Sequence, residues 1–233
     1  MRFQHSPQIW SDHPSLAAGA VSATGITADA SVADQVARFH AIAKERLSAS
    51  PESEFPEIQA WRRTFAGLGL KPTQYRCASE SLLRRFRKEG TLPEIHPLID
   101  LCNAISMAYA IPVAALDVAR IDSTLEVRYA TGDERYQTFG GEIENPAPGE
   151  VTFVDASGRS HARRWTNRQS GLSAVRASTS SVLIVTEALH DTAAADVRAL
   201  VGALAEELAA TWPTAPTPPA TAILSPTTPA FAF

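Results

Sequence analysis

Apolar residues recur at three- and four-residue steps through the first half of the chain and again near its end. This spacing puts them on one face of a helix and predicts amphipathic helices. Along the chain, the predicted helices cover about Val32–Ser48, Phe55–Leu68, Ser79–Lys88, Pro97–Tyr109 and Val197–Trp212. Proline is tolerated in a first helical turn, so Pro97 fits the start of the fourth helix.

After Pro112 the period changes from helical to alternating, which is typical of strands. Two apolar segments around the turn Asp155–Gly158 predict a hairpin. The predicted strands are Leu16–Gly25, Leu125–Tyr129, Val151–Val154, Ser160–Trp165 and Ser181–Val185. Helices first, strands in the middle and a helix last indicate an α+β domain rather than a βαβ repeat.

We expect this domain to cover residues 1–212. Residues 213–233 are rich in Pro, Thr and Ala and carry no charge. A segment of this composition buries little apolar surface by itself, so it is predicted to be a disordered tail.

Composition narrows the function classes. With 233 residues and 45% hydrophobic residues, the chain can bury a sizeable core, and its net charge is −4. A mildly acidic protein lacks the broad basic footprint of a nucleic-acid binder, so contact with tRNA would be local, weak and salt-sensitive, and no DNA partner is expected. Two cysteines and six scattered histidines give no disulfide framework and suggest no metal or cofactor. Without a leader or an apolar run of membrane length, we expect a cytoplasmic monomer or small homo-oligomer with no membrane association.

The helix predicted over 97–109 carries an acid and an amide on an otherwise apolar background. Asp100 and Asn103 lie one turn apart, and Ser106 lies beside them. Buried polar groups need partners. These side chains therefore either bind neighbouring backbone or line a pocket.

A second polar cluster follows the predicted hairpin. Arg163, Arg164 and Arg168 surround Trp165 and Asn167. Guanidinium groups make paired contacts with phosphate or carboxylate, and an indole offers a stacking surface, so the cluster suits a nucleotide end or an aminoacyl group. In a strand, Arg163, Trp165 and Asn167 would face one side.

That cluster has a structural alternative, in which the arginines pair with Glu134, Glu142 or Glu150 and the tryptophan joins the core. Glu134 and Glu142 follow glycines, at Gly132 and Gly141. Glycine serves tight turns, and it also lets a ligand approach the backbone. Both interpretations stay open from the sequence.

The order of several motifs resembles the B3/B4 domain of the phenylalanyl-tRNA synthetase β subunit. The family's V-D-x-x-N, Q-P-x-H-A-F-D, V-R-x-A-x-x-G-E and T-x-N-V-L motifs correspond to Ile99–Asn103, Pro112–Asp117, Val127–Glu134 and Ser178–Leu183. The Arg-Arg-Trp-x-Asn-Arg stretch is similar to that of freestanding B3/B4 proteins. The resemblance covers about Gln8–Trp212 and implies structural polar roles for Asp100, Asp117, Arg128, Glu134 and Thr179.

This resemblance implies helices around a mixed β-sandwich-like core with a central cleft. In the synthetase, that cleft hydrolyses tyrosine wrongly attached to the phenylalanine tRNA. The expectation is a tRNA-binding domain that edits misacylated tRNA in trans, with no synthetase activity of its own. The alternative is a non-catalytic binding module for an amino acid, a small metabolite or a tRNA end. A third possibility is another subunit docked on Phe55–Leu70.

Two positions depart from the family pattern. Ala114 stands where the family has a histidine, and Asn167–Gln169 contains no acid where the family has a hydroxyl-reading glutamate. A site that loses its hydroxyl reader is predicted to act on a different amino acid.

An aminoacyl ester is already activated, so an editing site needs to hold the ester, position a water and stabilise an oxyanion. No side-chain nucleophile is required, and none is assigned. Glu142 is a candidate for the amino group. We expect one shared cavity with these substrate-binding residues: Asn103, Ser106, Glu142, Arg164, Trp165, Asn167 and Arg168.

Overall fold

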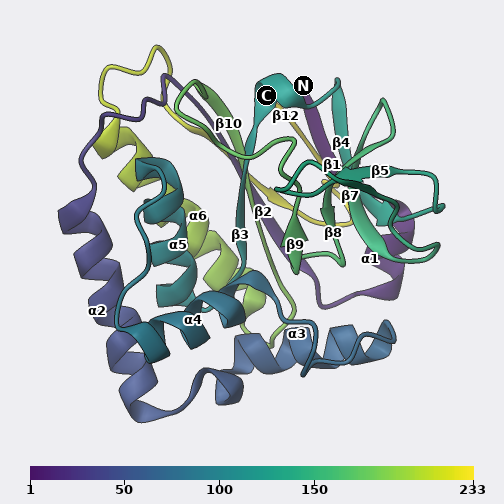
Figure 1. Ribbon diagram of the computed structural model, residues 1–233, viewed down its shortest axis with the longest axis horizontal. Coiled ribbons are helices and arrows are strands. Elements are labelled where there is room, and N and C mark those ends of the chain that lie inside the picture. Colours follow the sequence, from purple (N-terminus) through teal and green to yellow (C-terminus); the bar gives the residue numbers. More distant parts are fainter.

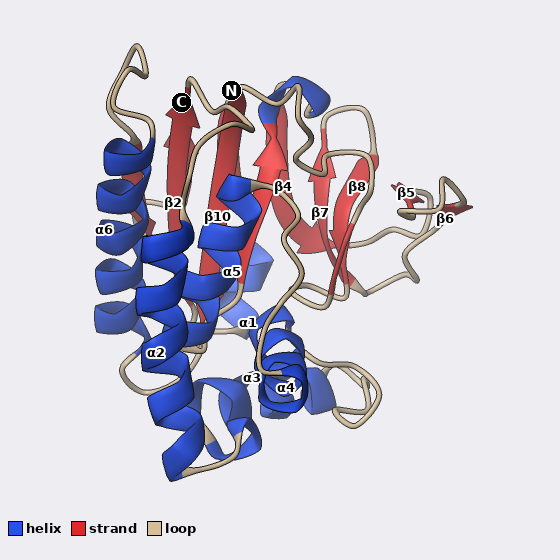
Figure 2. Ribbon diagram, turned by 60° about the vertical axis from the view of Figure 1, so that its left-hand side comes forward, coloured by secondary structure: helices blue, strands red, loops and turns tan.

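The computed structural model describes all 233 residues and has three layers (Figures 1 and 2). An outer layer of helices covers a four-stranded sheet, whose other face packs against an eight-stranded sheet. The helices are α1 (Pro7–Asp12), α2 (Ala33–Ala49), α3 (Pro56–Gly67), α4 (Ala78–Glu89), α5 (Pro97–Tyr109) and α6 (Ala193–Thr211). None of them is both long enough and apolar enough to cross a membrane.

The four-stranded sheet is antiparallel throughout and forms the middle layer. Its order is β11 (Ala220–Leu224), β2 (Ala17–Thr24), β10 (Ser181–Ala188) and β3 (Val113–Asp117). Small residues in β2 let α6 approach closely, because a Cβ at Gly19 would collide with the Val201 side chain. The strand of small residues predicted over 16–25 thus forms the surface on which α6 packs.

The eight-stranded sheet is mixed, because β1 runs parallel to β4 and β5 runs parallel to β8. It contains, in order, β12 (Ala230–Ala232), β1 (Arg2–His5), β4 (Thr124–Tyr129), β7 (Val151–Asp155), β8 (Arg159–Arg163), β5 (Arg135–Gln137) and β6 (Ile143–Glu144), and β9 (Arg168–Gln169) pairs with β8. The two facing sheets confirm the expected α+β fold with a mixed, sandwich-like core.

Strand β10 separates two hydrophobic cores. Val182 and Ile184 face the helices, whereas Leu183 and Val185 face the other sheet, as the two-residue period of a strand requires. Glu187 continues the second set, so its carboxylate points between the sheets.

Helices α3 and α4 lie below the two sheets and close the lower end of the space between them (Figure 1). The apolar side chains of α3, including Ile58, Trp61 and Phe65, are buried within the chain itself. These side chains are therefore packed within the chain and do not form an exposed apolar surface for another subunit.

The expectation of a disordered tail is not met. Residues 213–233 contain β11, which pairs with β2, and β12, which pairs with β1. Leu224 and Phe231 are buried, and the two chain ends lie side by side (Figure 1). The prediction of disorder from composition takes into account only the surface that a segment can bury by itself. Here the open edges of both sheets supply hydrogen-bond partners to the segment.

The five predicted helices match α2 to α6 to within a few residues, and the predicted hairpin is β7 and β8. Two details differ. Strand β8 ends at Arg163, so Trp165 and Asn167 lie in a loop rather than on one face of a strand. The short elements β1, α1, β5, β6 and β9 have no distinct period and were not predicted.

Candidate functional site

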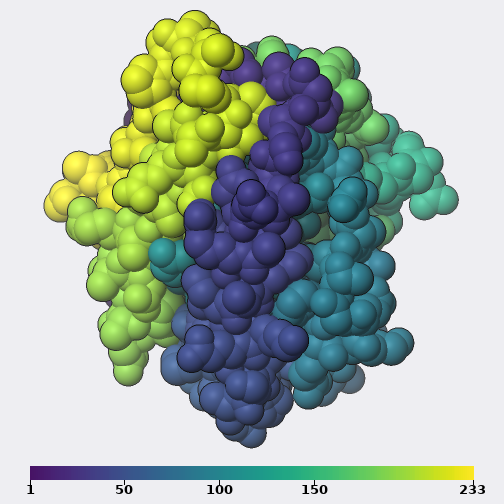
Figure 3. Space-filling view, turned by 90° about the vertical axis from the view of Figure 1, so that its left-hand side faces the viewer, coloured from purple at the N-terminus to yellow at the C-terminus, as the bar shows by residue number.

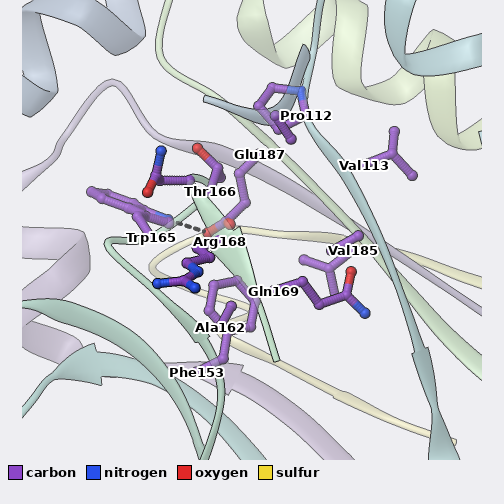
Figure 4. A pocket seen from close by; sticks show the side chains of 13 residues that line it. Pro112, Val113, Phe153, Ala162, Trp165, Thr166, Arg168, Gln169, Val185 and Glu187 are labelled. Carbon is purple, nitrogen blue, oxygen red and sulfur yellow. Dashed lines mark hydrogen bonds between the residues drawn. The ribbon is translucent and has the colours of Figure 1, made fainter. Parts of the chain in front are cut away.

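A cavity lies between the two sheets, where β3 and β10 face β7 and β8 (Figure 4). Its polar groups come from residues 165–169 and Glu187, and Ala78 at the start of α4 also borders it. The space open to the centres of water molecules is ≈ 60 Å³, which is room for about four to six waters. The apolar wall consists of Pro112, Val113, Ala114, Phe153, Ala162 and Val185.

Glu187 brings a carboxylate into this apolar surrounding. Its side chain is 2% exposed. Oε1 accepts hydrogen bonds from His5 Nε2 at 2.6 Å and from Trp165 Nε1 at 3.0 Å, and Figure 4 shows the carboxylate amid the lining side chains. Oε2 makes no hydrogen bond within the protein. Oε2 is open to the cavity rather than fully buried, so a ligand that donates a hydrogen bond can reach it there.

Trp165 holds that carboxylate in place. Its side chain is fully buried and meets the rings of Trp61 and His13 edge-on, with centroids 5.1 Å and 4.8 Å away. These ring contacts leave the indole little freedom to move out of the cavity wall. Burial also lowers the pKa of His13, although the carboxylates of Asp12 and Glu187 oppose this shift.

The loop that presents Trp165 has an unusual backbone. Arg164 has φ +48° and Trp165 has φ +56°. This left-handed region costs a residue with a Cβ about 1–2 kcal/mol. Hydrogen bonds hold the turn, since the Arg164 N–H donates to Glu150 Oε1 and the Trp165 N–H donates to the Val151 carbonyl, both at 2.8 Å. Such strain concentrates at functional sites, and here it turns the indole inward.

Two arginines of this loop lie near the cavity without being buried in it. Arg168 borders the cavity with a side chain that is 48% exposed, and its Nη1 lies 3.6 Å from Glu144 Oε2. Arg164 does not line the cavity; its guanidinium lies 4.8 Å from the ring centroid of Tyr75. Asn167 borders the cavity and donates from Nδ2 to the Arg76 carbonyl at 2.7 Å.

For Arg163 the structural interpretation holds, in which the arginines of this cluster pair with glutamates. Its guanidinium binds Glu150 at 2.9 Å and Glu144 at 2.6 Å, and its side chain is almost fully buried. Glu142, in contrast, is exposed in the loop between β5 and β6, and its N–H donates to Thr138 Oγ1 at 3.1 Å. It does not line the cavity.

The polar side of α5 lies elsewhere. Asp100 and Asn103 border a groove between α2 and residues 91–97, on the face shown in Figure 3, and this groove contains none of residues 165–169. Asp100 Oδ1 accepts the Ile95 N–H at 2.9 Å, and Ser106 Oγ donates to the Ile111 carbonyl at 2.6 Å. The prediction of one shared cavity is wrong, because α5 packs on the helical face of the four-stranded sheet.

The remaining polar residues of the motifs form two local pairs. Thr179 Oγ1 donates to Asp117 Oδ2 at 2.8 Å, where β3 ends. Arg128 Nη1 donates to Glu134 Oε1 at 2.6 Å. Both pairs lie outside the cavity. The first connects segments that are distant in the chain, and the second connects β4 to the irregular loop that follows it.

Glu134 gives a pH-dependent prediction. Burial raises its pKa, but the N–H groups of Thr131 and Gly132 and the Arg128 guanidinium outweigh that effect and lower it to about 2, from an ordinary value of 4.5. A lowered folded-state pKa stabilises the protein above pH 4.5, and this contribution disappears as the pH falls toward 2. Glu134→Gln should therefore lose about 2 kcal/mol of unfolding free energy at pH 7, with a difference from wild type that shrinks by pH 3.

Urea denaturation at both pH values measures this effect. Glu142→Gln is the matched control in the neighbouring loop, and it should leave the urea midpoint unchanged. A wild-type advantage over Glu134→Gln that is equal at pH 7 and pH 3 would contradict the assigned role of the carboxylate.

Neither cysteine offers a nucleophile. Cys77 and Cys102 are free and buried, and burial raises the pKa of each thiol to about 12, so both stay protonated at neutral pH. No cluster of three or more His, Cys, Asp or Glu side chains is placed to hold a metal ion.

Sequence reasoning missed Glu187, His5 and Tyr75. For Glu187 a signal exists, because an acid that continues the inward-facing positions of a buried apolar strand must meet a donor. Neither His5 nor Tyr75 lies in a segment with a clear period, and their partners are distant in the chain.

Two comparisons with known proteins gave matches. The model of a family described as the B3/4 domain matches residues 60–203. A solved N-terminal fragment of the phenylalanyl-tRNA synthetase β subunit from Pyrococcus horikoshii superposes with a TM-score of 0.48 at 11% sequence identity, over 90% of this chain and 48% of that one. The chain thus spans about half the length of that fragment. A search of curated protein sequences finds no match.

Proposed function

We propose that this chain, which belongs to the B3/4 domain family, binds the aminoacylated 3′ end of a tRNA in the cavity between the sheets and hydrolyses the ester. One observation carries the proposal: Glu187 places an oxygen without a protein donor in a cavity whose other groups are uncharged except Arg168 at its edge. The motif resemblance to a tRNA-editing domain supports the choice of substrate.

The negative charge of Glu187 and the positive charge of Arg168 match the ammonium group and the phosphate at the two ends of the aminoacylated nucleotide. The α-ammonium group would donate to Glu187 Oε2, since a charge-assisted hydrogen bond in a largely apolar cavity is stronger than a neutral one. The terminal phosphate would lie at the guanidinium of Arg168. Beside it, the Arg164–Tyr75 pair offers a cationic and aromatic surface of the kind on which nucleobases stack.

Hydrolysis then needs little from the protein. Water adds to the ester carbonyl carbon, the bond to the 3′ oxygen breaks, and that oxygen takes a proton, which leaves a free amino acid and an uncharged tRNA. Asn167 has a second amide hydrogen beyond the one given to Arg76, and the Thr166 hydroxyl at the cavity has no partner. These donors are suited to the developing oxyanion.

The direct experiment incubates the purified protein with a panel of aminoacyl-tRNAs and measures release of the amino acid. Arg168→Ala should raise KM about tenfold and reduce the salt dependence of tRNA binding by about one phosphate contact. Arg120→Ala, which removes an exposed arginine outside the site, is the matched control and should change neither.

The runner-up function is a binding module without turnover, which the alanine at position 114 favours because no imidazole reaches the cavity from β3. Saturable binding of aminoacyl-tRNA with release no faster than in buffer would establish this alternative. If neither binding nor release is seen with any tRNA, both functions are wrong.

A further inference from the structure

We infer that the exposed basic face of α4 binds the phosphates of the tRNA that follow its aminoacylated end. This inference rests on the proposed function, because it identifies the surface that holds the body of the same substrate. The basic side chains on this face of the helix do not line the cavity, so their role is separate from that of Glu187 and Arg168.

Positive charge is concentrated in residues 52–90. This segment contains eight Lys or Arg and five Glu, which is a net charge of +3, whereas the whole chain has a net charge of −4. Two of the acids, Glu52 and Glu80, are buried. Six basic residues of the segment are exposed, against two acidic ones: Arg63, Lys71, Arg84, Arg85, Arg87 and Lys88 against Glu54 and Glu89. A local basic surface on an acidic protein attracts a polyanion.

The two buried carboxylates each bind a pair of arginines. The groups are Glu80 with Arg62 and Arg76, at 2.6 Å and 3.2 Å, and Glu52 with Arg84 and Arg87, at 3.4 Å and 3.1 Å. One acid between two arginines leaves each group with a net charge of +1. A guanidinium has five N–H donors, so donors remain for a phosphate, and a guanidinium already held in place loses less freedom on binding.

The group at Glu52 lies on the exposed side of α4. Arg84 and Lys88 are four residues apart and Arg87 is three residues after Arg84, so the three side chains share one face of the helix. Lys88 is exposed and forms no ion pair. These cations therefore form a row that faces water, and the regularly spaced phosphates of a nucleic-acid strand form a row of opposite charge.

This row begins beside the cavity. Helix α4 starts at Ala78, which borders the cavity, and the Ala78 N–H donates to the Thr166 carbonyl at 2.8 Å (Figure 1). At a rise of about 1.5 Å per residue, Arg84 lies about 9 Å and Lys88 about 15 Å further along the helix. A strand that advances about 3.4 Å per nucleotide covers this distance in about three to four nucleotides. The continuity with the cavity favours RNA over an acidic peptide as the occupant.

The test measures the binding of uncharged tRNA, so that its readout does not depend on hydrolysis. Wild type should bind tRNA at least about tenfold more tightly than a dinucleotide with the sequence of the 3′ end, which is too short to reach the row. Arg84→Gln combined with Lys88→Gln should weaken tRNA binding about tenfold and reduce the slope of log affinity against log salt by about 1.5. This variant leaves Arg87 bound to Glu52.

Arg38→Gln combined with Arg198→Gln is the matched control. It removes two exposed positive charges from α2 and α6, so affinity and salt slope should stay at the wild-type values. Urea midpoints show whether both double variants are folded. Lys88→Gln alone repeats the test at a side chain without an ion pair, and it should reduce the salt slope by about 0.8.

The outcomes separate this inference from the proposed function. If the α4 variants bind tRNA like wild type while the ester is hydrolysed, the inference is wrong and the proposed function stands. Wild-type protein that binds polyglutamate as tightly as tRNA would also overturn the inference, because the surface then fits an acidic peptide. Binding of tRNA that depends on α4, without release of the amino acid, would support the surface and reject the hydrolysis.

Discussion

Glu187→Gln is expected to lower kcat/KM for aminoacyl-tRNA about 100-fold while leaving the fold intact. The glutamine oxygen can still accept the hydrogen bonds from His5 and Trp165, so the contact between the sheets persists. What disappears is the negative charge facing the ammonium group, and charge-assisted hydrogen bonds contribute about 1.5–3 kcal/mol. Since each 1.4 kcal/mol is a factor of ten, the loss is one to two orders of magnitude.

Two measurements make this prediction specific. Thermal unfolding should show a small change, in contrast to Glu187→Ala, which leaves His5 and Trp165 without their acceptor and should cost about 3–5 kcal/mol. Glu206→Gln, an exposed acid on α6, is the matched control for loss of one negative charge. If Glu187→Gln hydrolyses aminoacyl-tRNA like wild type, the carboxylate does not bind the substrate.

Trp165→Ala is expected to cause a large loss of stability, about 3–5 kcal/mol. The side chain is fully buried between Trp61 and His13, and its removal leaves a void that the stiff strands around it cannot fill. Equilibrium unfolding in urea, followed by circular dichroism, measures this loss. The more conservative Trp165→Phe keeps most of the ring and removes only the donor to Glu187, at a cost of about 1–2 kcal/mol.

These variants distinguish packing from positioning. If the indole N–H orients Glu187, Trp165→Phe should lower kcat/KM several-fold beyond what its small loss of stability explains. Trp212→Ala removes another buried tryptophan, one that donates to Thr27 and lies outside the cavity, so it should lower stability without changing kcat/KM for the folded fraction. Equal activity losses in Trp165→Phe and Trp212→Ala would mean that Trp165 acts through stability alone.

Much of the fold was predictable because the relevant information is local. The helix over Pro97–Tyr109 follows from apolar steps of three and four residues, a proline in the first turn and a second proline beyond the end. The hairpin around Asp155–Gly158 follows from turn residues between two apolar segments. Such patterns depend on neighbours within one or two turns, and the final structure leaves them intact.

The candidate site was predictable only in part. Trp165, Asn167 and Arg168 border one cavity, and the cationic and aromatic cluster that they form beside a turn is visible in the residues themselves. Asn103 and Ser106 were assigned to the same cavity because α5 has a polar side, but a helical period does not say which neighbour that side meets. Ser106 in fact binds the Ile111 carbonyl.

Residue periodicity was thus enough to identify the long helices, the central strands and the α+β class, since each element's apolar face is encoded within a dozen residues. Packing of the layers settled the rest: it put Glu187 between the sheets beside His5, placed Asp100 and Asn103 on another face, and drew residues 220–232 into strands. These outcomes depend on hydrogen bonds and contacts between segments up to 232 positions apart. No local pattern encodes such pairings, because the partner becomes available only when the whole core assembles.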